Sequence, residues 1–95
     1  MFDLGTLGGN TSYGYGINTS GNVVGASLIS GSFETFHGFI VSGRKMYDLN
    51  ALLDNASRHY VIVNASGINT AGQIAADAMI NGATHAVLLT PNAAR

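Results

Sequence analysis

A short pattern that occurs twice constrains this chain more than any other feature. Residues 16–24 read GINTSGNVV, and residues 67–75 read GINTAGQIA, 51 positions later. A pattern repeated at a fixed spacing indicates related structural units packed side by side. Each copy places Asn and Gly, which favour turns, directly before β-branched residues or alanine. The repeat therefore predicts a strand, a tight turn and a second strand at the centre of each half of the chain.

Further repeats extend the match over nearly the whole sequence. Residues 1–4 read MFDL and residues 46–49 read MYDL, while residues 36–41 correspond to residues 84–89. The last offset is 48, which places three extra residues of the first repeat in its 32–35 loop. We expect repeats at about 1–45 and 46–91, with residues 92–95 as a frayed tail. The structural positions that repeat are Asp3 and Asp48, Gly16 and Gly67, Asn18 and Asn69, Gly21 and Gly72, and His37 and His85.

The pattern of strand and turn residues predicts an all-β fold in a single domain spanning residues 1–95. Strands are expected at 12–18, 22–29, 36–41, 60–68, 73–80 and 84–89, separated by turns rich in Gly and Asn. Residues 5–9 contain three glycines and are expected to form a loop, and residues 50–56 to form a short helical turn. Units of about 45 residues of this kind are typical of antiparallel β-meanders or propeller blades. Open sheet edges would then need cover, by compact pairing of the two units or by a homo-oligomer.

Composition excludes several classes of function. Charged residues make up 9% of the chain and the net charge is −1, so no basic face exists for nucleic acid. The absence of cysteine excludes a disulfide framework and a cysteine-based zinc site. No apolar run approaches the roughly 20 residues of a membrane-spanning helix, so membrane insertion is not expected. The first residues lack the features of a signal peptide.

The repeated motifs resemble those of the HAF family of bacterial extracellular repeat proteins, whose name comes from a His-Ala-Phe signature. The matching motifs are DLGTLGG at residues 3–9, GINTSGNVVG at 16–25, HGFI at 37–40 and MYDL at 46–49. The second copy departs from the family pattern, with HAVL at 85–88 and NALL at 50–53. The resemblance implies an exported or surface-displayed protein without enzymatic activity, which would be antigenic because of its location. Family members carry many repeats, so two repeats imply a minimal unit or a fragment.

The histidine and aspartate positions are candidates for chemistry, but their repetition favours structural roles. His37 and His85 would need further ligands, such as Asp3, Asp48 or Asp77, to hold a metal, and no metal-ligand spacing is present. A histidine that bonds a turn carbonyl in both units explains the repetition more simply. Asp3 and Asp48 are expected to accept hydrogen bonds from turn amides. We therefore predict no cofactor, no metal and no catalytic residue.

Two sequence patterns are alternatives to this interpretation, because they are typical of hydrolases. Residues 42–45 match the Ser-x-x-Lys of penicillin-binding enzymes, but they lie at an expected β-turn, whereas that chemistry needs a helix. A Ser-His-Asp triad would lack the Gly-x-Ser-x-Gly elbow that exposes the nucleophile. A small hydrolase therefore remains the weakest alternative.

Aromatic side chains provide the best candidate binding surface. Tyr13, Tyr15 and Phe36, with Phe33 and Glu34 in the inserted loop, would contact a partner, although core packing needs some of these rings. The resulting prediction is a non-catalytic module that binds an unknown protein partner or copies of itself. A lectin-like module that binds glycans through the same aromatics is the alternative.

Overall fold

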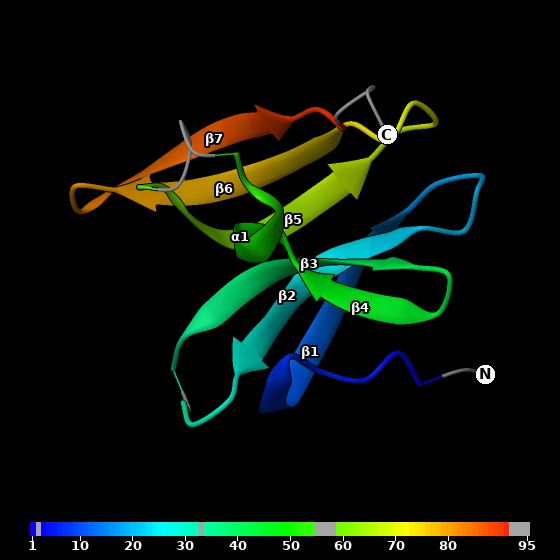
Figure 1. The fold of residues 1–95 in the computed structure, drawn as a ribbon, viewed down its shortest axis with the longest axis horizontal. Helices are drawn as coiled ribbons and strands as arrows, with labels where there is room; N and C mark the ends of the chain where they lie inside the picture. The colour runs from blue at the N-terminus through cyan, green and yellow to red at the C-terminus, as the bar shows by residue number, and fades with distance from the viewer. Residues whose placement is uncertain (2, 33, 55–58, 92–95) are drawn as a thin grey trace.

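The structure is a computed structural model that describes residue 1 and residues 3–32, 34–54 and 59–91. It contains two antiparallel sheets joined by one helical turn, which confirms the expected all-β fold of two sheet units (Figure 1). The first sheet has four strands in chain order: β1 (Gly8–Ile17), β2 (Val23–Ile29), β3 (Phe36–Ser42) and β4 (Lys45–Asp48). The second sheet has three: β5 (Val61–Ile68), β6 (Ile74–Ile80) and β7 (Ala83–Leu89). The connecting turn is α1 (Leu49–Leu52).

Equivalent residues of the two sheets pair in the same register. Val24 pairs with Ile40 in the first sheet, and the equivalent Ala75 pairs with Leu88 in the second. The first strand of each sheet also carries a register shift just before its repeated glycine. The repeat in sequence is therefore a repeat in backbone pairing, although the side chains at paired positions differ.

The central turns of the repeats are built alike and touch one another. The Gly21 amide donates to the Asn18 carbonyl, and the Gly72 amide donates to the Asn69 carbonyl, both at 3.0 Å. Both glycines have φ of 84°, a conformation that residues with a side chain rarely adopt. The Asn18 side-chain amide also donates to the Asn69 carbonyl at 3.1 Å. The turns predicted from the repeat are thus present, and they form part of the contact between the sheets.

Two of the expected elements have a boundary that differs by more than one residue from the observed one. Strand β1 begins at Gly8 instead of after a loop at 5–9, because Gly8 pairs with Ile29. The helix covers 49–52 instead of 50–56, because Asp48 caps its start and Leu53 has an extended backbone; residues 55 and 56 lie outside the described residues. No helix in the described part of the chain is long and apolar enough to cross a membrane.

The main core lies between the sheets, where β5 crosses the face of the first sheet (Figure 1). At this crossing, a Cβ added to Gly38 of β3 would lie 2.8 Å from a methyl group of Ile62. The absence of a side chain at Gly38 therefore permits the close approach of the two sheets. The buried residues of this core cluster are Val24, Leu49, Ile62, Ala65, Ile74, Ala76 and Ala78.

Candidate functional site

Three aromatic side chains gather on the first sheet and form the principal candidate site. Tyr13 and Tyr15 of β1 are 50% and 54% exposed. Their rings are nearly parallel, at 9°, with centroids 6.3 Å apart. The ring centroid of Phe36, at the start of β3, lies 5.9 Å from that of Tyr13. We call Tyr13, Tyr15 and Phe36 the aromatic cluster.

Strand pairing explains how distant residues reach this cluster. Tyr13 pairs with Ala26 of β2, and Phe36 pairs with Leu28, two residues further along the same strand. Directly paired residues project from the same face of a sheet, and so do residues two apart. Ala26 also pairs with Gly38, which abuts β5. The aromatic cluster therefore occupies the face that β5 covers further along.

The second sheet carries no such cluster at its equivalent positions. The shared offsets place Asn64 and Ser66 where the first sheet has the two tyrosines, and Thr84 where it has Phe36. The same backbone scaffold is thus built with small polar residues at these sites. Exposed aromatic rings are therefore a property of the first sheet alone and not a requirement of the fold.

The loop before β3 contributes one described residue of the predicted surface. Glu34 is exposed, and its amide donates to the Ser32 hydroxyl at 3.2 Å. Phe33, which was predicted as part of the same surface, lies outside the described residues. The register shows the expected insertion, because eight positions separate the paired Leu28 and Phe36, whereas five separate the paired Met79 and Thr84.

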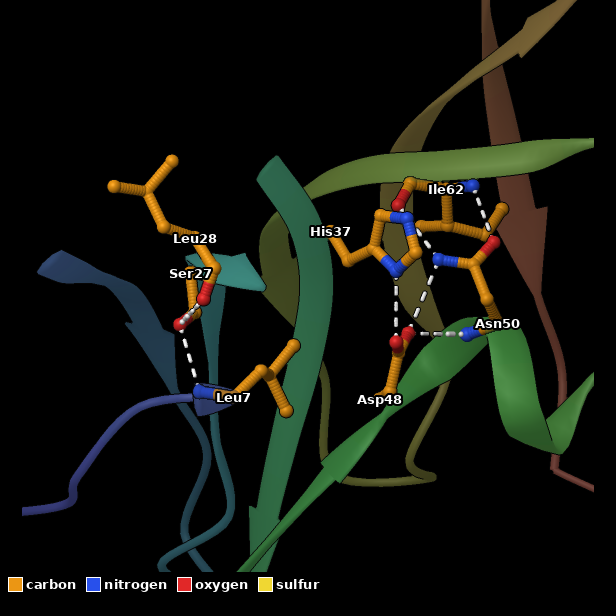
Figure 2. Close-up of polar contacts among 7 residues, drawn as sticks. All are labelled: Leu7, Ser27, Leu28, His37, Asp48, Asn50 and Ile62. Carbon is orange, nitrogen blue, oxygen red and sulfur yellow. Dashed lines mark hydrogen bonds and ion pairs between the residues drawn. The ribbon is translucent and has the colours of Figure 1, made fainter. Parts of the chain in front are cut away.

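A polar network at the far edge of β3 is the second place where predicted residues meet (Figure 2). His37 Nδ1 and Asp48 Oδ2 are 2.7 Å apart. The other oxygen of Asp48 accepts from the Asn50 amide at 2.9 Å and from Asn50 Nδ2 at 3.1 Å. The Asn50 side chain also bonds both backbone groups of Ile62, at 2.7 Å to the amide and 3.0 Å to the carbonyl.

This network connects the two sheets. The Asn50 side-chain amide bonds the Ile62 peptide as a neighbouring strand would, with one donor and one acceptor. The Asp48 carboxylate accepts hydrogen bonds from Asn50 and so orients it, and the contact with His37 in turn orients that carboxylate. The repeat predicts that His37 bonds a turn carbonyl, and this is wrong, because its partner is the Asp48 carboxylate. The arrangement fixes α1 and β5 against the first sheet, which is a structural role.

Two serines of the first sheet, one of them in the Ser-x-x-Lys pattern, occupy structural positions. Ser27 is fully buried, accepts from the Leu7 amide at 2.9 Å and bonds the Leu28 carbonyl at 2.9 Å (Figure 2). Ser42 and Lys45 are paired residues that flank a two-residue turn between β3 and β4. Among the residues that the structure describes, no hydrogen bond joins a serine hydroxyl to a histidine ring.

The second copies of the histidine and aspartate lie apart. His85 on β7 is exposed, and its imidazole has no hydrogen-bond partner within the described ranges. Asp3 accepts from the Gly5 amide at 2.9 Å, the same i to i+2 bond that Asp48 makes with Asn50. In the described part of the chain, no group of three or more His, Asp or Glu side chains is placed to hold a metal ion.

Asn50 is a residue of this site that no sequence motif indicates. The residues around it predict only a short helical turn at 50–56, and Asp48 caps the turn that forms. Its contact with Ile62 depends on where β5 packs, twelve residues further along the chain. No local pattern around Asn50 signals that contact.

Comparison of this chain with protein-family models, with curated proteins and with solved structures gives no match. The candidate site is therefore defined by its own geometry.

Proposed function

We propose that this protein is a non-catalytic β-repeat module that binds a protein partner through the aromatic cluster. The observation that carries the proposal is the pair of half-exposed, nearly parallel rings of Tyr13 and Tyr15 beside Phe36. The resemblance to HAF repeats supports export or display at the bacterial surface. Antigenicity would follow from that location.

The physical character of the cluster favours a protein partner. Tyrosine is enriched among interface residues that dominate binding energy, because it offers a large apolar ring and a hydroxyl. Rings held on paired strands lose little conformational freedom on binding. The second sheet replaces them with polar residues, so stability of the scaffold does not account for their presence.

The test compares a Tyr13→Ala/Tyr15→Ala double variant with a Tyr47→Ala control. Tyr47 is 37% exposed on β4 and is not part of the cluster. The wild-type chain would be immobilised and exposed to extracellular proteins of the source cell and its surroundings, and any bound protein purified and titrated. We expect the double variant to weaken that affinity at least about 30-fold, as loss of an interface anchor does, and the control to leave it unchanged. Equal affinity for all three proteins would contradict the proposal.

A glycan ligand is the second candidate, favoured by the 9° angle between the two tyrosine rings. Near-parallel aromatic rings can stack against the apolar faces of sugar residues. A glycan array followed by titration calorimetry decides between the candidates. A glycan that binds the wild type and Tyr47→Ala, but not the double variant, would support the lectin-like alternative. Silence on the array would remove it.

A further inference from the structure

The outer edge of β7 lacks the strand that its equivalent in the first sheet has. Strand β3 lies between β2 and β4, whereas β7 pairs only with β6 in the described structure. On β3, Phe39 pairs with Asp48 and Val41 pairs with Met46. The position equivalent to Phe39 is Val87, which faces no fourth strand. The first sheet thus defines both the site and the register of the strand that the second sheet lacks.

The chain contains a second copy of the missing strand's sequence. Met1, Asp3 and Leu4 repeat the Met-x-Asp-Leu pattern that runs through β4 into α1. Met1 and Asp3 are exposed, and residues 3–6 belong to no strand. This segment lies at the other end of the molecule from β7 (Figure 1). The edge and its matching sequence are both present, but they are not paired with each other.

His85 on β7 and Asp3 in the N-terminal segment also correspond to a bonded pair of the first sheet. In the first sheet, His37 bonds Asp48 at 2.7 Å. The imidazole of the equivalent His85 is exposed and has no hydrogen-bond partner among the described residues. The carboxylate of Asp3, the equivalent of Asp48, bonds only the nearby Gly5 amide there. His85 and Asp3 are thus equivalent to the two residues that bond each other in the first sheet, but they do not bond each other.

Apolar surface beside β7 is also open. Leu88 is 64% exposed, whereas its equivalent Ile40 packs against the core between the sheets. A hollow of about 210 Å³ opens next to this strand. Exposed apolar surface along an unpaired edge favours association with another strand. The hollow is lined by Leu53, Tyr60, Ile62, Val87, Leu88 and Leu89.

We infer that a second copy of this chain adds its Met-x-Asp-Leu segment to β7 as a fourth, antiparallel strand. Asp3 of that copy lies opposite Val87, Met1 lies opposite Leu89, and the Asp3 carboxylate bonds His85. The contact joins different surfaces of the two copies, so it repeats head to tail. In β-propellers, about four to eight sheets close a ring. Because each copy of this chain contributes two sheets, about two to four copies would close one. The aromatic cluster takes no part in this association.

The register is tested by disulfide cross-linking. The chain has no cysteine, so only the introduced cysteines can form a disulfide. Asp3→Cys protein is mixed with Val87→Cys protein under oxidising conditions, and Ala83→Cys replaces Val87→Cys as the control. Ala83 and Val87 lie on the same strand about 13 Å apart, beyond the reach of one disulfide. We expect a cross-linked heterodimer with Val87→Cys in at least tenfold excess over the control. Equal yields with both partners, or no cross-link, would overturn the inference.

The polar pair is tested by exchanging its charges. Sedimentation of the wild-type chain is expected to show a discrete oligomer of two to four copies. His85→Asp places two carboxylates together and should weaken association about fivefold, whereas adding Asp3→Lys in the same chain should restore it. His59→Asp, at another exposed histidine, serves as the control and should have no effect. A wild-type monomer at all concentrations, or a His85→Asp variant that assembles like the wild type, would contradict the inference.

Discussion

At the scale of single residues, Asn50 makes the most consequential polar contacts in the described structure. Its side chain satisfies both backbone groups of Ile62, a residue that is only 1% exposed. A buried peptide group that loses its partner costs more than an ordinary hydrogen bond contributes, because water cannot replace the lost partner. Asp48 and His37 support this contact by orienting Asn50, and they therefore act on stability through it.

Replacing Asn50 with alanine should lower the free energy of unfolding by about 2–3 kcal/mol. The variant removes the bonds to Ile62 and leaves its buried amide and carbonyl unpaired. Asn10→Ala provides the control, since Asn10 is an exposed asparagine on β1 and its loss should change stability by less than about 0.5 kcal/mol. Urea denaturation of the three proteins gives the measurement. Similar midpoints for Asn50→Ala and the wild type would show that Asn50 does not join the sheets.

At the scale of elements, the two sheets have the same register but different surroundings. Strand β5 packs on the face of the first sheet, and glycine at position 38 leaves room for it. The second sheet has Ala86 at the position equivalent to Gly38, and Ala86 is exposed. The glycine is therefore needed where a sheet approaches closely, and not by the strand itself.

Substituting Gly38 with alanine should destabilise the protein by about 1–3 kcal/mol through overpacking. The added methyl group would meet Ile62 at 2.8 Å and the Asn64 backbone at 3.1 Å. Gly67→Ala is the matched control within a strand, because its Cβ would have no atom within 4 Å. We expect the control to leave stability unchanged or to raise it by up to about 1 kcal/mol through reduced freedom of the unfolded chain. Thermal unfolding followed by circular dichroism compares them, and equal losses would refute the role given to Gly38.

At the scale of the whole molecule, the first sheet has four strands and the second has three. The boundary between the sheets falls after Asp48, so the Met-x-Asp-Leu motif that begins the second sequence repeat closes the first sheet. The copy that begins at Met1 has the same Met-x-Asp-Leu pattern without the same pairing. The inferred head-to-tail association would supply that pairing from a second chain.

Association of this kind makes thermal stability depend on protein concentration. Assembly that binds only folded chains stabilises them by mass action, by up to about 1.4 kcal/mol for each tenfold increase in concentration. The unfolding midpoint of the wild type should therefore rise between micromolar and millimolar concentrations, and that of His85→Asp should rise less. Differential scanning calorimetry at several concentrations gives the comparison. A wild-type midpoint that stays constant would exclude folding-linked assembly.

The sequence by itself determined the turns, and through them the pairing of neighbouring strands. Asn81 and Gly82 both have positive φ, as a two-residue hairpin turn of Asn-Gly requires. The Asn and Gly residues of the repeat likewise predict the turn that begins at Asn18. Such turns depend on the sterics of a few consecutive residues. A strand joined by a tight turn then has little choice of register.

Only the tertiary structure decided which distant side chains meet. Tyr13 and Phe36 become neighbours because β2 lies between their strands and carries both to one face. Asn50 reaches Ile62 only because β5 packs across the first sheet. Burial of apolar faces determines how the sheets dock, and burial is a property of the assembled molecule and not of any short segment.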